Sequence, residues 1–186
     1  PPPLPPVMPP INLNSLTELE GKGAAMSTSA SPLRWPATAV VDGDLNTICA
    51  TEFPPRQAHE WISVRLDPSA RIDYVAVYNR NDNAAFQEWL SPFEIWIGSD
   101  YGDTTSSTAA RCGGIRQVVT GVGPFFTDCT NAVSKHDRRH PNSAVQSTEP
   151  PGSKYVTLRL AGERKRSVTV AEIKVYQSPL PPYPPS

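Results

Sequence analysis

Short segments in which apolar and polar residues alternate constrain the fold of this chain more than any other feature. Alternation with a period of two is typical of a β-strand that turns one face toward a core. The segments that show it are 62–66, 75–78, 93–97, 156–160 and 168–175. Because no stretch of ten residues has a convincing helical periodicity, the sequence predicts an all-β fold.

Turn-forming residues separate these segments. They lie at 67–69, 98–100, 113–114, 121–124 and 150–152. Glycine and proline in such clusters favour tight turns. A longer polar stretch, 131–153, predicts function or mobility rather than core. Short strands joined by turns and long loops favour a β-sandwich.

The size and charge of the chain exclude several classes of protein. With 186 residues it is long enough for one domain with a core and short for two. Its net charge of −1 provides no bulk field that would attract nucleic acid. No apolar run approaches the ~20 residues that span a bilayer. We therefore expect neither nucleic-acid binding nor membrane insertion.

Proline is concentrated at the two ends of the chain. Of its 22 prolines, seven lie in segment 1–10 and five in segment 179–186. Such tracts prefer the extended polyproline II form, which favours semi-rigid linkers at 1–11 and 179–186 around a folded middle, 12–178. Disordered tails, or ligands for aromatic grooves, are the alternatives. The tracts resemble the proline-rich shafts of hydroxyproline-rich glycoproteins.

An acidic turn follows the short apolar run that begins at Ala39. It contains Asp42, Gly43, Asp44 and Asn46, whose side-chain and backbone oxygens suit a hard cation such as calcium. The turn lacks the twelve-residue pattern of an EF-hand, and Asp-Gly-Asp turns are common without any metal. The motif alone therefore leaves the calcium site open.

The last alternating segment, 168–175, changes phase. Its apolar residues switch parity between Val170 and Ile173, which predicts a β-bulge at Ala171 and Glu172. A bulge can aim the Glu172 carboxylate into a partly buried place, where the charge needs a partner such as arginine or a metal. The alternative is an exposed glutamate on an edge strand.

Seven segments occur in an order that characterises one superfamily. They are Gly21–Ala25, Ala39–Asp44, Trp61–Leu66, Ile72–Arg80, Phe93–Gly98, Lys154–Leu160 and Val170–Val175. Together they resemble the F5/8 type C (discoidin) superfamily of galactose-binding-like domains. Within it, the Asn-Arg-x-Asp segment 79–82 resembles the F-type lectins, or fucolectins. The resemblance covers roughly residues 20–177 and implies a jelly-roll β-sandwich.

The resemblance also implies a structural calcium site. The ligands that it implies are the side chains of Asp42 and Glu172, the main-chain carbonyls of Ala39, Asp44 and Ala171, and the hydroxyl of Thr51. The acidic turn and the change of phase point to the same two carboxylates without the resemblance. We therefore expect Ca²⁺ as the cofactor.

F-type lectins hold fucose with a histidine and with two arginines that flank a pair of cysteines. By this resemblance, Arg80 matches the first arginine, while Asn83 and Ala84 replace the cysteines. The second arginine aligns near Gln87. The histidine corresponds to His59, although its spacing differs.

An arginine fork can hold two sugar hydroxyls while an aromatic face packs on the ring. Arg80 with Trp89 or Phe86 can form such a site. The alternative is that Arg80 pairs with Asp82 or another carboxylate and only shapes the loop. The candidate sugar-binding residues are Arg80, Asp82, Gln87, Trp89 and His59.

Three cysteines remain to be placed. The resemblance implies a disulfide between Cys112 and Cys129, which indicates an oxidising, extracellular compartment. Cys49 has a partner position in the family, but Ala171 occupies it here. Cys49 is therefore either free and buried or bonded to another chain.

No motif of an enzyme is present. The stretch 135–140 has two histidines spaced as in some zinc sites, but its basic residues favour a solvated loop. No nucleophile elbow, phosphate-binding glycine loop or HExxH motif occurs. A second basic patch, 164–166, together with 135–140, can engage sulfated or uronic polysaccharide or can simply be solvated charge.

The sequence thus predicts a non-enzymatic, extracellular, calcium-stabilised carbohydrate-binding module of a larger proline-rich surface or matrix glycoprotein. Its partners would be glycans or glycoproteins. An alternative is a structural protein–protein node in a fibrous or cell-surface assembly, with a decayed sugar site and with other copies or subunits as partners. A third, weaker alternative is an accessory domain that delivers an enzyme to polysaccharide.

Overall fold

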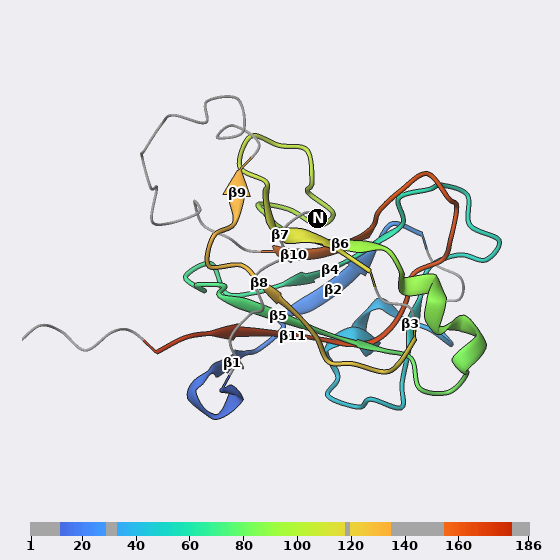
Figure 1. The fold of residues 1–186 in the computed structure, drawn as a ribbon, viewed down its shortest axis with the longest axis horizontal. Helices are drawn as coiled ribbons and strands as arrows, with labels where there is room; N and C mark the ends of the chain where they lie inside the picture. Colours follow the sequence, from blue (N-terminus) through green and yellow to red (C-terminus); the bar gives the residue numbers. More distant parts are fainter. Residues whose placement is uncertain (1–11, 29–32, 118–119, 135–154, 180–186) are drawn as a thin grey trace, which may run out of the picture.

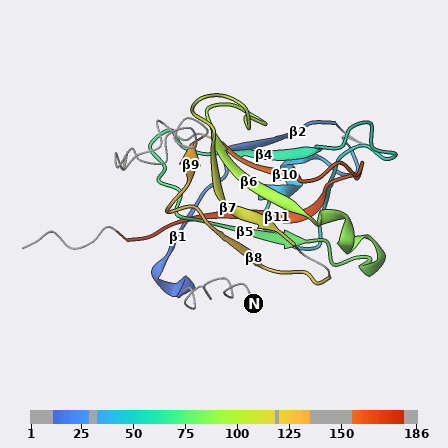
Figure 2. The same ribbon diagram turned by 45° about the horizontal axis from the view of Figure 1, so that its top comes forward.

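A computed structural model describes residues 12–28, 33–117, 120–134 and 155–179 of the chain. Two antiparallel sheets pack face to face in a β-sandwich (Figures 1 and 2). The predicted linker 1–11, nearly all of 179–186 and the basic stretch 135–140 lie outside the described residues.

The two sheets take their strands from all parts of the described chain. In the first sheet the order is β1 (Thr17–Leu19), β11 (Thr169–Gln177), β5 (Tyr74–Asn79) and β8 (Phe125–Asp128), and β3 (Cys49–Ala50) pairs with the start of β11. In the second it is β2 (Gly23–Met26), β4 (Trp61–Arg65), β10 (Tyr155–Leu160), β6 (Phe93–Gly98), β7 (Ala110–Arg116) and β9 (Val133–Ser134). The described residues also form three 3₁₀ helices: η1 (Leu13–Ser15), η2 (Ala37–Val41) and η3 (Ala84–Leu90).

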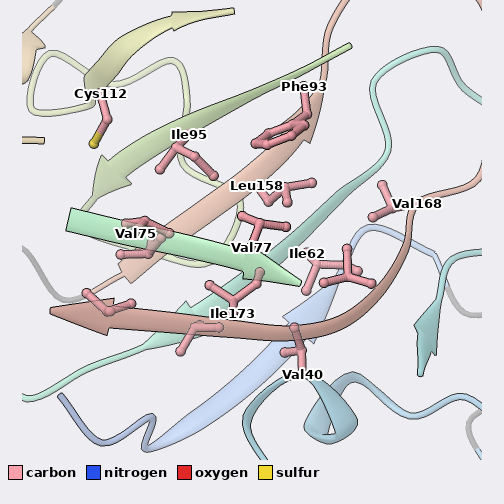
Figure 3. Close-up of a cluster of buried hydrophobic side chains, with 14 of the residues drawn as sticks. Val40, Ile62, Val75, Val77, Phe93, Ile95, Cys112, Leu158, Val168 and Ile173 are labelled. Carbon is pink, nitrogen blue, oxygen red and sulfur yellow. The ribbon is translucent and has the colours of Figure 1, made fainter. Parts of the chain in front are cut away.

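The core fills the space between the two sheets. Val75 and Val77 of β5 turn inward from one sheet, and Ile95 of β6 and Leu158 of β10 turn inward from the other (Figure 3). All four are fully buried, and each side chain of this size stabilises the fold by about 1.5–3 kcal/mol through removal from water. The predicted alternation is therefore confirmed: every second residue of these strands belongs to the core.

One predicted turn is wrong. Gly113 and Gly114 lie inside β7, where the register against β6 shifts between the pairs Phe93–Arg116 and Ile95–Cys112. Gly113 has a φ of 51°, a conformation that glycine adopts without strain. The glycine pair thus accommodates extra residues in a bulged strand instead of ending it.

Several loops gather where β5 and β10 end and where β4 and β6 begin, at the right of Figure 1. We call this the loop end of the sandwich. It carries segment 51–60, the helix η3 and the turn 161–168 from β10 into β11. The chain enters and leaves the sandwich at the other end, where Thr17 of β1 pairs with Gln177 of β11.

The cysteines follow the expected pattern. Cys112 of β7 and Cys129, just after β8, form a disulfide that links the two sheets. Cys49 is free and fully buried in β3, and burial raises the pKa of its thiol to about 12. The thiol is therefore neutral at physiological pH.

Candidate functional site

The predicted bulge in the last strand is present. The register of β11 against β5 shifts between Val170 and Glu172. Because β11 lies between β1 and β5, Glu172 is not on an edge strand, and the alternative of an exposed glutamate is wrong. Glu172 is only 4% exposed, and its Oε2 accepts a hydrogen bond of 3.1 Å from the N–H of Gly43.

This hydrogen bond brings the last strand to the acidic turn. Burial raises the pKa of Glu172 to about 7, the Gly43 N–H opposes that shift, and the nearby carboxylate of Asp42 adds to it. Asp42 and Glu172 therefore approach closely enough to repel each other when both are ionised. The acidic turn and the last strand, both singled out in the sequence, are thus in contact through Gly43 and Glu172.

The acidic turn is held by hydrogen bonds of its own. Asp42 accepts from the N–H of Asp44 at 2.9 Å and from the hydroxyl of Thr47 at 2.8 Å. Asp44 in turn accepts from the backbone and side-chain nitrogens of Asn46, both at 2.9 Å, which lowers the pKa of Asp44. These bonds hold the turn in a tight loop.

The donors at this place suit a hard cation, because all of them are oxygen atoms. In the described part of the chain, no three His, Cys, Asp or Glu residues gather in a way that could hold a metal ion. A cation here would thus need hydroxyl and main-chain oxygens besides Asp42 and Glu172. The expected hydroxyl of Thr51 accepts a bond of 2.8 Å from the N–H of Val168, whereas the hydroxyl that reaches Asp42 belongs to Thr47.

A cavity of about 430 Å³ opens beside the acidic turn. Its walls include the indole of Trp35 and the polar side chains of Asn46, Thr47 and Asp82. The guanidinium of Arg34 lies over the Trp35 ring, 4.7 Å from its centroid. We call this space the Trp35 cavity. It joins one aromatic face to several hydrogen-bonding groups.

Arg80 is connected to this cavity through Asp82. Its Nε and Nη2 donate to the two carboxylate oxygens of Asp82, each at 2.7 Å, and these bonds lower the pKa of Asp82. Arg80 is 8% exposed, and its guanidinium lies 4.9 Å from the centroid of Phe86. The arginine fork is therefore engaged by Asp82, and it is Asp82 that lines the cavity.

Gln87 has a supporting position. Its Nε2 donates to the carbonyl of Arg80 at 3.1 Å, and its Oε1 accepts from the N–H of Gly121 at 2.9 Å. Because Gln87 is buried, these bonds tie η3 to the end of β5 and to the loop before β8.

Trp89 and His59 lie elsewhere at the loop end. The indole of Trp89 stacks on Phe53, with 5.1 Å between ring centroids, and lines a smaller cavity of about 130 Å³. The Nδ1 of His59 lies 3.2 Å from the carbonyl oxygen of Leu160. The five predicted sugar residues thus lie in or near η3 and in the loop before β4. Of the five, only Asp82 lines the Trp35 cavity.

Sequence reasoning missed most of the residues around the Trp35 cavity. Trp35, Asn46 and Thr47 were not singled out as sugar ligands, although they lie within twelve residues of one another. A tryptophan outside any alternating segment, followed by Pro36 and then by an acidic turn, is a signal that was available in the sequence.

The model of the F5/8 type C domain matches residues 24–120, which is more than half of the chain. The chain belongs to the F5/8 type C domain family. Its sandwich is the discoidin, or galactose-binding-like, fold. No curated protein sequence matches the chain at a significant level.

Solved structures share this fold at low sequence identity. A family 32 carbohydrate-binding module of NanJ from C. perfringens, in complex with galactose, is 14% identical with a TM-score of 0.55, covering 87% of this chain and 99% of that one. A fucolectin from Morone saxatilis (striped bass) serum is 20% identical with a TM-score of 0.61, covering 86% of this chain and 49% of that one. An F5/8 type C domain from Bacteroides fragilis is 14% identical with a TM-score of 0.62, covering 89% and 99%.

No helix in the described residues is long and apolar enough to cross a bilayer.

Proposed function

We propose that this domain is a non-catalytic carbohydrate-binding module that holds a sugar in the Trp35 cavity. The observation that carries the proposal is the lining of that cavity, which includes Trp35 together with Asn46, Thr47 and Asp82. A pyranose has an apolar face and a rim of hydroxyl groups. An aromatic wall with a few fixed polar groups matches both features.

Each polar group has a definite part in this arrangement. The Asp82 carboxylate accepts hydrogen bonds from sugar hydroxyls, while Arg80 holds it in place from behind through two bonds of 2.7 Å. Asn46 and Thr47 can donate or accept. Galactose in the NanJ module and the fucolectin fold support a saccharide as the ligand.

Calcium has a structural part in the proposal. Bound between Asp42 and Glu172, Ca²⁺ would neutralise two carboxylates that otherwise repel. The residues that would complete its shell are Ala39, Asp44 and Ala171 through their carbonyls, with the hydroxyl of Thr47 or Thr51. Asp42 and Thr47 also line the Trp35 cavity, so the ion would set the shape of the sugar site.

The disulfide Cys112–Cys129 supports an extracellular location for the module, since disulfides persist in oxidising compartments. The proline-rich segments 1–11 and 179–186 are proposed to connect it to the rest of a surface or matrix glycoprotein.

Binding of the domain to a glycan array of neutral saccharides, measured in a buffer that contains calcium, tests the sugar site. Trp35→Ala and Asp82→Asn are expected to weaken any binding at least tenfold, which corresponds to about 1.4 kcal/mol for each lost contact. Tyr74→Ala and Asp67→Asn are the matched controls, because both residues lie at the other end of the sandwich. Binding that survives Trp35→Ala unchanged would overturn the Trp35 cavity as the site.

A second function is favoured by one specific observation. The Arg80 fork, which would hold sugar hydroxyls in a fucolectin-like site, is fully engaged by Asp82. A structural node that binds protein instead of glycan would have this closed pair. No binding to any glycan of the array, by a correctly folded domain, would favour the protein-binding structural node.

A further inference from the structure

Arg166 is a buried cation in the turn 161–168. It is 5% exposed, and its Nη2 donates to the carbonyl of Ala161 at 2.6 Å and lies 3.4 Å from the carbonyl oxygen of Pro92. Its Nε and Nη1 are buried and have no hydrogen-bond partner among the described residues. Two of the three guanidinium nitrogens are therefore unsatisfied.

Among the described residues, no acidic side chain forms an ion pair with Arg166. The same holds there for Arg164 and Lys165. Burial lowers the pKa of Arg166, and the like charge of Arg164 lowers it further. A buried guanidinium without a counter-ion is costly, because arginine stays charged in proteins. Arg80, by contrast, has the Asp82 carboxylate.

Arg166 lines the smaller cavity, of about 130 Å³, together with Arg164 and Lys165. Two aromatic residues also belong to the lining: Phe53 and Trp89 stack with an angle of 18° between their planes. The Phe53 ring is 65% exposed, which is unusual for so large an apolar side chain. We call this space the Arg166 cavity. It combines a cationic wall with an accessible aromatic platform.

We propose that the Arg166 cavity binds the anionic group of an acidic saccharide, a carboxylate or a sulfate, while the sugar ring packs on Phe53. The anion neutralises the charge of the Arg166 guanidinium, which lines the cavity and whose Nε and Nη1 have no hydrogen-bond partner among the described residues. Exposed Arg164 and Lys165 attract the ligand and complete its neutralisation. The cavity is small enough that it takes the charged group rather than a whole oligosaccharide.

This inference rests on the proposed function in one respect, namely that the ligand is a saccharide. The site itself is separate, since the Arg166 cavity and the Trp35 cavity share no lining residue. One domain thus has a neutral sugar subsite and an acidic one.

Calorimetric titration of the full chain, in calcium at low ionic strength, tests the acidic subsite. The probes are tetragalacturonate, a heparin-derived tetrasaccharide and a neutral galactotetraose. We expect at least one acidic probe to bind tenfold more tightly than the neutral one, and the preferred probe identifies carboxylate or sulfate. Equal affinity for all three would overturn the proposal.

Variants at exposed positions locate the binding without endangering the fold. Lys165→Ala and Phe53→Ala are each expected to weaken the acidic probe at least fivefold. Lys22→Ala removes an equal charge at the other end of the sandwich and should change nothing. Affinity that falls equally in Lys22→Ala and Lys165→Ala would show diffuse charge attraction and would overturn the site.

Arg166→Leu addresses the buried cation directly. It should abolish acidic binding and leave a folded domain, because it removes a charge that no side chain of the described residues compensates. If Arg166→Leu does not fold, the two exposed variants still decide the outcome. If the acidic tetrasaccharides do not bind while neutral saccharides still bind in a way that depends on Trp35, this inference is overturned and the proposed function is left intact.

Discussion

Glu94 and Glu172 are both buried carboxylates on inner strands, but their charges have different partners. Glu94 of β6 is 5% exposed and accepts a bond of 2.8 Å from Arg159 of β10, and Arg111 of β7 lies 3.5 Å away. Glu172 of β11 has the Gly43 N–H, and it faces the like charge of Asp42.

The difference follows from where each residue lies. Within a sheet, neighbouring strands can place arginines directly beside a glutamate, and Arg159 is the register partner of Glu94. At the loop end, Glu172 and Arg166 are buried by loops that provide few partners of opposite charge. We interpret the compensated charge of Glu94 as structural, and the uncompensated charges of Glu172 and Arg166 as candidate ligand-binding groups.

Removing calcium is expected to give the largest effect. An ion at one hundred times its Kd adds about 2.7 kcal/mol to the free energy of unfolding, which for a domain of this size raises Tm by roughly 5–11 °C. Scanning calorimetry in calcium and in EDTA measures the difference. Asp42→Asn and Glu172→Gln should abolish it. A Tm that EDTA leaves unmoved would remove calcium from the proposal.

Glu94→Gln should lower the free energy of unfolding by about 2 kcal/mol, with or without calcium. It leaves Arg111 and Arg159, which lie on the strands on either side of β6, without their shared carboxylate. Both arginines are partly exposed, so the loss is smaller than for a fully buried pair. Urea unfolding in both buffers measures it. A loss that appears only in calcium would contradict the contrast with Glu172.

Glu172→Gln should act in the opposite direction when calcium is absent. In EDTA and above pH 7, where Glu172 with its pKa of about 7 is mostly ionised, it removes a desolvated charge that Asp42 repels, while the amide oxygen can still accept from Gly43. We expect a gain of about 1 kcal/mol in the free energy of unfolding. Urea unfolding in EDTA tests this, and a clear loss would mean that Glu172 is compensated by the chain after all.

Arg164→Gln should have the smallest effect on stability, within about 0.5 kcal/mol, because the side chain is exposed. Its effect on the acidic tetrasaccharides should be far larger than its effect on unfolding. Thermal unfolding and the titration described above, performed on the same preparation, separate the two.

The longest strands could be predicted because each buries one face, and burial leaves an alternating pattern in the sequence. The bulge at Glu172 could be predicted for the same reason, since an extra residue shifts that pattern. The short strands β1, β2 and β3 could not, because two to four residues are too few to show a period. In β7, the pair Gly113–Gly114 resembles a turn signal.

The candidate site was predicted less completely. Asp42 and Glu172 could be singled out because each leaves a local signal in the sequence. The Trp35 cavity depends on how segment 33–36 folds against the acidic turn, and no local pattern records that. In the sequence, the pattern around Arg166 predicts three solvated basic residues in a row. Its burial arises from contacts with Pro92 and Ala161, which come from different parts of the chain.

The pairing of Thr17 with Gln177 has a mechanical consequence. Tension on the two flanking segments would act on the same end of the antiparallel pair β1–β11, and the ladder would open one residue pair after another, like a zipper. A small force would therefore be enough to separate β1 from β11. The loop end lies at the opposite end of the sandwich from the point where the force acts, so it would stay free to bind a surface.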